Sequence, residues 1–431
     1  MGEWRPSVVY REGRSRAVAA GACAAGAFRG ERVDPVNAEQ RHEIVSQTCR
    51  IVKSLAMYGR YILGNRNSLR NLMPFIRLIR HFKRELLLVL LCAGALRIDP
   101  VLGQNLIGEF QEAPERSNSV FEYEIEAFDA KNYQAAVENL LGIYERSNDR
   151  YFTPGSKGKV GLKVYSNSGP GLSTPEALVE ALVKSLIKRG YKRSDIFIIG
   201  LHGRMLRESG FLPPLSHRSM LFNKVFVRSL DSGEYYDEKW FYDSPLPAKS
   251  SQYWINIDEE NAIGKKSDES RERKSYLPMP LMHEVDFWVN MPCYSDHPTL
   301  GINGALMNAT LWNASNTTRF LRSPVSAPVA VAEMGAVPEL RETWALNIVS
   351  LQRFQYVGGP IFNSMYTVSE PLVMLSDNPV LLDSIMSERI NKHRKKNGFA
   401  PLPQELKILA YSEQLGLGAK DTSFANLISA N

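Results

Sequence analysis

The chain has 431 residues, 44% of them hydrophobic and 23% charged, and its formal net charge is +6 at pH 7. This composition belongs to a globular protein with a sizeable core and excludes a disordered or fibrous chain. The basic excess lies in the first hundred residues, while the remainder is mildly acidic and has no basic stripe. We therefore expect no nucleic-acid partner.

The four cysteines lie far apart, and no two of them form a CxxC pair. An iron–sulfur cluster or a structural zinc site needs several cysteine or histidine ligands at short spacings, so we expect no iron–sulfur cluster. Three of the four belong to the N-terminal hundred residues, which also argues against a disulfide framework. The residues identify no other cofactor and no particular metal.

Residues 1–72 form a basic, Arg- and Ala-rich extension with little helical or strand periodicity before about residue 40. Met57 and Met73 are alternative translation starts, so the sequence leaves open whether this extension belongs to the true protein.

Residues 73–103 carry four basic residues ahead of an uninterrupted apolar run of eleven residues, which ends near small residues. This order is typical of a secretory signal peptide, and the run is too short to span a bilayer. On this interpretation the mature chain begins near Gln104, works outside the cytoplasm in the periplasm or medium, and has no membrane span. The alternative is a buried helix in a helical, cytoplasmic N-terminal segment.

The chain from residue 104 alternates strands with helices. Apolar residues recur every three or four positions over 133–144, which predicts a helix. Alternating Val160, Leu162 and Val164 predict a strand, residues 173–190 a helix that starts at Ser173 or Thr174, and residues 195–200 a second strand. This βαβ order implies parallel strands with a right-handed crossover.

Further strands are expected at 224–230, 251–257, 285–291, 346–351 and 371–376, with a charged loop over 260–275 and a helix over 379–398. This pattern predicts an α/β fold, with a mostly parallel or mixed sheet covered by helices on both faces. We find no long linker, so residues 104–431 are expected to form a single domain.

Polar residues follow several of the predicted strands, where ligands of open α/β sheets collect. Lys163 and Asn167 end the first strand, and the glycines and helix start that follow offer backbone N–H groups to an anion. Asp296 and His297 follow the strand at 285–291, and a carboxylate beside an imidazole suits acid–base chemistry or metal binding. An ordinary turn is the alternative explanation for each motif, and such motifs are more often turns than sites.

The last strand is followed by Asp377 and, on the next helix, by Asp383. Asp377 can cap that helix, which is the structural explanation for its position.

Four segments, taken in their order along the chain, resemble the domain of unknown function 362 family over about residues 159–399. They are KVGLKVYSN, VDFWVNMPCYSDHPTLGINGALMN, YVGGPIFN and VMLSDNPVLLDSI. The resemblance implies architecture and site positions, but no established reaction.

The resemblance assigns family positions to eight residues: Lys163, Asn167, His297, Asn308, Gly358, Gly359, Asp377 and Asp383. Two cationic positions of the family are changed, because Ser295 and Asp296 replace a Lys-Thr pair and Met307 replaces a lysine. These changes weaken the inference that the same anionic ligand is bound.

Two hypotheses follow. In the first, an exported α/β protein binds a small ligand or metal at the strand ends, as an enzyme or as a binding protein. Asp296 and His297 would then act as acid and base or as ligands. Asn167 and Asn308 would orient the substrate, and Lys163 would supply positive charge. In the second, the protein is a non-catalytic scaffold or partner-binding protein with a decayed site. Oligomeric state is not encoded in any motif.

Overall fold

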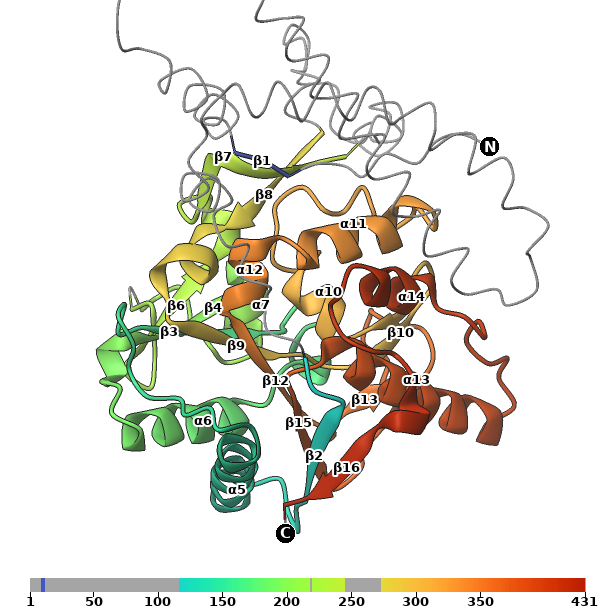
Figure 1. Cartoon of the computed structure of the whole chain (residues 1–431), viewed down its shortest axis with the longest axis horizontal. Helices are drawn as coiled ribbons and strands as arrows, with labels where there is room; N and C mark the ends of the chain where they lie inside the picture. Colours follow the sequence, from blue (N-terminus) through green and yellow to red (C-terminus); the bar gives the residue numbers. More distant parts are fainter. Residues whose placement is uncertain (1–8, 12–115, 218, 245–272, 431) are drawn as a thin grey trace, which may run out of the picture. The chain divides into compact units, whose positions relative to one another are not determined.

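The computed structural model describes residues 9–11, 116–217, 219–244 and 273–430. These residues form a nine-stranded mixed sheet with helices on both faces (Figure 1), so the predicted α/β class is confirmed. The expected N-terminal helical segment, the signal-like residues 73–103 and the strand expected at 251–257 lie outside the described residues. No described helix is both long enough and apolar enough to cross a membrane.

The centre of the sheet consists of five parallel strands in the spatial order β12-β9-β3-β4-β6. Their bounds are Trp344–Ser350, Phe287–Met291, Val160–Val164, Ile196–Gly200 and Val225–Ser229. The predicted βαβ unit is present as β3, α6 and β4. Because these strands run in the same direction, their carboxyl ends lie along one edge of the sheet.

Antiparallel strands flank the parallel centre. On one side, β15 (Leu372–Ser376) pairs with β12, β2 (Ser119–Glu124) pairs with β15, and β16 (Asn426–Ser429) runs parallel to β2. On the other side, β5 (Leu221–Phe222) forms a short hairpin with β6. The strand expected at 371–376 is therefore present, and it makes the sheet mixed.

One face of the sheet packs against α5 (Ala130–Asn148) and α6 (Glu176–Lys188). The buried residues of α5 recur with helical spacing and meet the side chains of Val160, Leu162 and Val164 in one apolar cluster. Asp129 caps α5 by accepting a hydrogen bond from the backbone N–H of Asn132.

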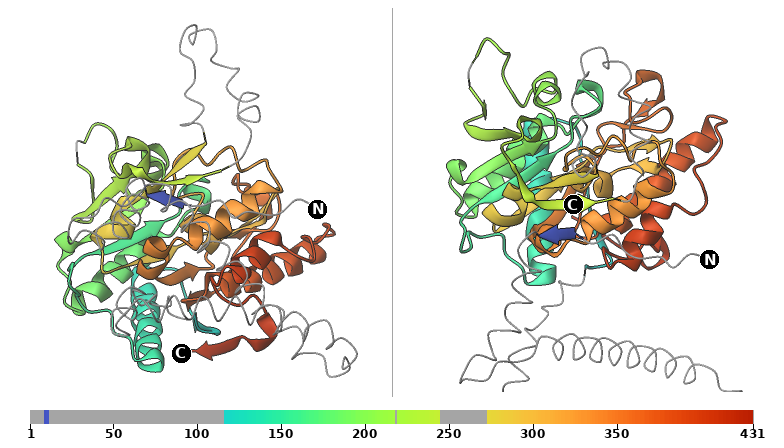
Figure 2. Two further views of the ribbon diagram at one scale, coloured as in Figure 1. Left: turned by 45° about the horizontal axis from the view of Figure 1, so that its top comes forward. Right: turned by 90° about the horizontal axis from the view of Figure 1, so that it is seen from above.

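On the opposite face of the sheet, the described helices share one apolar cluster with the strands (Figure 1). These helices are α10 (Ala305–Ala309), α11 (Ser326–Gly335), α12 (Pro338–Thr343), α13 (Pro379–Lys396) and α14 (Lys407–Gln414). Trp288 and Trp344 stack on this face with 5.2 Å between ring centroids. Figure 2 shows α5 and α13 on different sides of the sheet from two further directions.

The segment after β9 differs from the sequence-based expectation of a turn leading into a helix. Residues Ser295–His297 (β10) and Gly301–Asn303 (β11) form an antiparallel hairpin, and only the five residues of α10 are helical. β10 also pairs with β13 (Phe354–Gln355), which pairs with β14 (Thr367–Val368). The Gly-Gly-Pro loop, defined here as residues 358–366, lies between β13 and β14.

A separate three-stranded sheet has the order β1-β7-β8. It joins Val9–Arg11 to Tyr236–Asp243 and Lys274–Pro278. Residues 9–11 of the basic extension therefore pair with the described fold, and β8 begins inside the segment expected to be a loop at 260–275.

Candidate functional site

A row of polar side chains crosses four neighbouring strands near the carboxyl ends of β3 and β9. Lys163 is paired in register with Asn290, Asn290 with Asn347, and Asn347 with Ser376. Residues paired in this way project from the same face of a sheet. This face is the one covered by α10–α14, because Leu162 and Val289, which alternate with the polar residues, belong to the cluster on the α5 and α6 side.

Lys163 is buried and has no carboxylate partner among the described residues. Its Nζ donates to the carbonyl of Val164 at 3.0 Å and to Oδ1 of Asn308 at 3.1 Å. Burial disfavours the ammonium form and lowers the pKa of Lys163 to about 7. The side chain can therefore exist as a neutral amine near neutral pH.

The amides continue this chain of hydrogen bonds. Asn308 Nδ2 donates to Asn290 Oδ1 at 2.8 Å, Asn290 Nδ2 to Asn347 Oδ1 at 2.9 Å, and Asn347 Nδ2 to the carbonyl of Ser376 at 3.1 Å. All three asparagines are fully buried. The row thus satisfies its own polar groups and ties α10 to the sheet.

Asp383 anchors the start of α10 from the neighbouring helix α13. Its carboxylate accepts hydrogen bonds from the backbone N–H groups of Ala305 and Leu306 at 2.7 and 3.1 Å, and from the hydroxyl of Tyr294 at 2.8 Å. Burial raises the pKa of Asp383 to about 7, although these hydrogen bonds favour the charged form.

Asp296 holds the Gly-Gly-Pro loop in place. Its carboxylate accepts hydrogen bonds from the backbone N–H groups of Gly358 at 3.2 Å and Gly359 at 2.7 Å, and it pairs with Arg394 at 3.0 Å. Gly358 has φ +83°, a conformation that favours glycine. A Cβ on Gly359 would lie 2.3 Å from the carbonyl oxygen of Asp296, so packing requires glycine at 359, whereas the backbone conformation favours it at 358.

His297 closes the turn between β10 and β11. Its Nδ1 accepts hydrogen bonds from the backbone N–H groups of Thr299 and Leu300, both at 3.2 Å. Burial lowers the pKa of His297 to about 4, so the ring is neutral at physiological pH. The adjacent Asp296 faces a different set of partners, and among the described residues the two side chains share no hydrogen-bond partner.

Asp377 and Asn167 lie in two further environments. Asp377 accepts hydrogen bonds from the backbone and hydroxyl of Ser117 and from the hydroxyl of Tyr144, which belongs to the α5 side. Both polar side-chain atoms of Asn167 are buried without a partner among the described residues. The hydroxyl of Ser166 is likewise buried and has no described partner.

The structure therefore brings the predicted residues together only in part. Lys163 contacts Asn308, and Asp296 contacts Gly358 and Gly359. Within the described part of the chain, no hydrogen bond joins His297 to Asn167, Asn308 or Asp377. Most of these side chains are occupied by bonds inside the protein.

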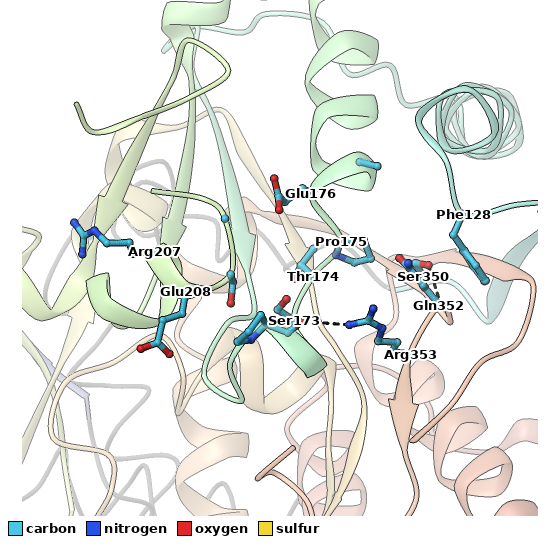
Figure 3. A pocket seen from close by; sticks show the side chains of 14 residues that line it. Phe128, Ser173, Thr174, Pro175, Glu176, Arg207, Glu208, Ser350, Gln352 and Arg353 are labelled. Carbon is cyan, nitrogen blue, oxygen red and sulfur yellow. Dashed lines mark hydrogen bonds between the residues drawn. The ribbon is translucent and has the colours of Figure 1, made fainter. Parts of the chain in front are cut away.

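A cleft of about 410 Å³ opens at the carboxyl ends of β3, β4 and β12, on the α6 side. We name it the Arg353 cleft. Among its lining residues are Ser173, Glu176, Ser209, Ser350, Gln352 and Arg353. Figure 3 shows Arg353 extending from the end of β12 toward the loop that carries Ser173 and Pro175, while Arg207 points away from it.

The start of α6 supplies free donors to this cleft. Pro175 caps the helix without a side-chain hydrogen bond. The backbone N–H groups of Glu176 and Ala177 have no acceptor among the described residues, because the first bonds of the helix run from Leu178 and Val179 to Pro175. Such free N–H groups, together with the helix dipole, attract anions.

Two side chains of the Arg353 cleft add donors to the helix start. Ser209 is 5% exposed, and its hydroxyl has no partner among the described residues. Arg353 makes only long contacts, at 3.4 and 3.5 Å, with the carbonyls of Pro170 and Gly171, and no described carboxylate pairs with it. A positive guanidinium and a buried, unpaired hydroxyl thus line the same hollow.

Two acidic side chains line the cleft: Glu208, which pairs with Arg204 at 2.7 Å, and Glu176 at the start of α6. Burial raises the pKa of the Glu176 carboxyl, and its oxygens pack against Gly210. Among the described residues, this carboxyl has no hydrogen-bond or ion-pair partner.

The sequence pointed to this region through the glycines and helix start after β3, but not to Arg353 or Ser209. Arg353 follows an apolar strand without any recognisable motif, and only the tertiary fold places it opposite residues 173–177. In the part of the chain that the structure describes, no three His, Cys, Asp or Glu side chains gather as a metal site would require.

No protein-family model and no curated protein matches this chain. Among solved structures, it is similar to the crystal structure of a protein from Thermotoga maritima, a structural genomics target. The identity is 12%, the TM-score is 0.30, and the alignment covers 68% of this chain. It spans 60% of the length of that protein.

Proposed function

We propose that this protein binds a small molecule with an anionic group in the Arg353 cleft, at the carboxyl ends of the parallel strands. The observation that carries the proposal is the meeting, in one hollow, of three kinds of donor that are free or make only long hydrogen bonds. They are the guanidinium of Arg353, the free N–H groups at the start of α6, and the buried hydroxyl of Ser209.

Charge and preorganisation support this function. Donors that are already fixed and partly desolvated lose little freedom when an anion binds. Glu176 opposes the anion while it is ionised, and burial raises the pKa of its carboxyl. Anion affinity should therefore increase as the pH falls through the pKa of Glu176.

Calorimetric titration with inorganic phosphate and with acetate tests the proposal. Arg353→Gln should weaken binding about tenfold or more, because a charge-assisted hydrogen bond contributes about 1.5–3 kcal/mol. Arg146→Gln, the same change at an exposed site on α5, is the control and should leave affinity unchanged. Glu176→Gln should tighten binding.

Equal affinity for Arg353→Gln and the wild type would overturn the assignment of the cleft. Loss of binding in the Arg146→Gln control would point to a general charge effect instead. Circular dichroism of each variant verifies that the fold is retained.

We also propose that the chain is a diverged relative of the domain of unknown function 362 family. The support is that the resembling segments fall on β3, on β9 with β10, β11 and α10, and on β15 with α13, which pack together. Superposition on an experimental structure of a family member tests this, and a different strand order would refute it.

Export through residues 73–103 is a further part of the proposal, supported by the signal-like order of charges and apolar residues. The expected mature N-terminus lies near Gln104. Mass spectrometry of protein from the native host decides the matter, and an N-terminus well before residue 90 would exclude export by this route.

A further inference from the structure

A second hollow adjoins the Arg353 cleft and has a different character. It has a volume of about 670 Å³ and shares Pro170, Gln352 and Arg353 with the cleft. Phe362 and Val368 belong to its lining. We name it the Phe362 groove. The two hollows meet at Arg353, so a ligand held by that guanidinium can continue into the groove.

The Gly-Gly-Pro loop lines this groove with Phe362, and it exposes two more apolar side chains, Ile361 and Met365, that are not part of the lining. Ile361 is 78% exposed, Met365 77% and Phe362 37%. The ring of Phe362 lies directly over Gly171, where a Cβ would come within 2.3 Å of the ring. Exposed apolar side chains grouped on one short loop are unusual for a surface without a binding partner.

Hydrogen bonds from a buried side chain hold the Gly-Gly-Pro loop in this arrangement. Gln355 is fully buried, and its Nε2 donates to the carbonyl of Ile361 at 2.8 Å. Its Oε1 accepts a hydrogen bond from the backbone N–H of Asn363 at 2.7 Å. These two bonds fix the backbone on either side of Phe362, and Asp296 fixes the glycines that precede it. The apolar wall is therefore formed before any ligand arrives.

We propose that the ligand of this site is an amphiphile, with an acidic head group in the Arg353 cleft and an unbranched apolar chain in the Phe362 groove. This inference rests on the anion-binding function proposed above and names its ligand class. The guanidinium at the junction sets the orientation, because Ser209 and the start of α6 line the cleft, whereas Phe362 and Val368 line the groove. A preformed groove lets the chain bind with little ordering of the protein.

The test compares acetate, hexanoate and decanoate by calorimetric titration, below the concentration at which decanoate forms micelles. A fully buried methylene strengthens binding about fourfold, so a methylene in an open groove should contribute about twofold. We therefore expect affinity to rise steadily with chain length. Decanol, which keeps the chain but lacks the charge, should bind at least about tenfold more weakly than decanoate.

Two matched variants locate the chain. Phe362→Ser should remove most of the dependence on chain length and leave the affinity for acetate unchanged. Phe424→Ser changes a phenylalanine that is 73% exposed and does not line the groove, and it should alter neither. Unchanged circular dichroism and thermal midpoint verify that both variants are folded.

The outcomes separate the two proposals. Binding of acetate with no gain for decanoate would overturn the amphiphile and leave the anion site intact. Failure of all carboxylates and phosphate to bind would overturn the anion site itself. A chain-length dependence that persists in Phe362→Ser, or decanoate binding in several copies per chain, would place the apolar chain elsewhere and refute the groove.

Discussion

Replacing Lys163 by methionine tests the electrostatic account of the polar row. Burial lowers the pKa of Lys163 from 10.5 to about 7. At about 1.4 kcal/mol for each tenfold change in proton affinity, this difference corresponds to about 5 kcal/mol. Below pH 7 both the folded and the unfolded chain carry the proton, so the cost of burying the charge is fully present. Above about pH 10.5 neither carries it, and the cost vanishes.

Between these limits the unfolded chain holds a proton that the folded chain has released. The free energy of unfolding of the wild type should therefore rise with pH. The methionine variant lacks this group, and the donor it removes from Asn308 Oδ1 produces an offset that does not depend on pH. We expect the difference between wild type and variant to shift by about 2 kcal/mol in favour of the wild type between about pH 7.5 and about pH 9.

Urea unfolding at several pH values measures this difference. Lys184→Met removes an exposed lysine from α6, and its difference from the wild type should stay constant over the same range. A constant difference for Lys163→Met as well would refute the argument, because it would show that Lys163 does not titrate as a buried, unpaired amine.

Three further substitutions test the remaining structural assignments. His297→Ala should lower the free energy of unfolding, measured in urea, by about 1–3 kcal/mol, because two backbone N–H groups lose their acceptor. It should leave phosphate affinity unchanged, and altered phosphate binding would contradict a purely structural role. Gly359→Ala should destabilise the protein by more than about 1 kcal/mol in the same assay, because its Cβ would overlap the carbonyl of Asp296, and a neutral effect would contradict the packing. Asp383→Asn removes a carboxyl whose pKa is raised in the folded state. The variant should therefore gain stability relative to the wild type as the pH rises from about 4 to about 7. A difference in free energy of unfolding that does not change with pH would refute the raised pKa.

The regular parts of the fold were predictable because they follow local periodicity. The helix at 133–144 and the alternating strand at Val160, Leu162 and Val164 appear as α5 and β3. The hairpin of β10 and β11 was missed, because three-residue strands carry too few side chains to establish a period. In addition, β10 pairs with β13 through Ser295 and Gln355, a long-range pair that local periodicity does not predict.

The candidate site was predictable only as a region. The sequence directed attention to polar residues near strand ends, but it could not predict their hydrogen-bond partners, because hydrogen bonds between strands depend on register and on the covering helices. Lys163 and Asn308 are 145 positions apart and still form a direct contact. Arg353 belongs to no recognisable motif, and only the fold places it in the same cleft as the loop at residues 173–177.

The row formed by Lys163, Asn290, Asn347 and Ser376 has a consequence for folding. Sliding any one of these strands by a single position would turn its polar member toward the apolar side chains of α5 and α6. Each such misalignment would bury an ammonium, an amide or a hydroxyl without a partner, at a cost of several kcal/mol. The row therefore favours the native register of the four strands over registers shifted by one residue, and it does so before any ligand is present.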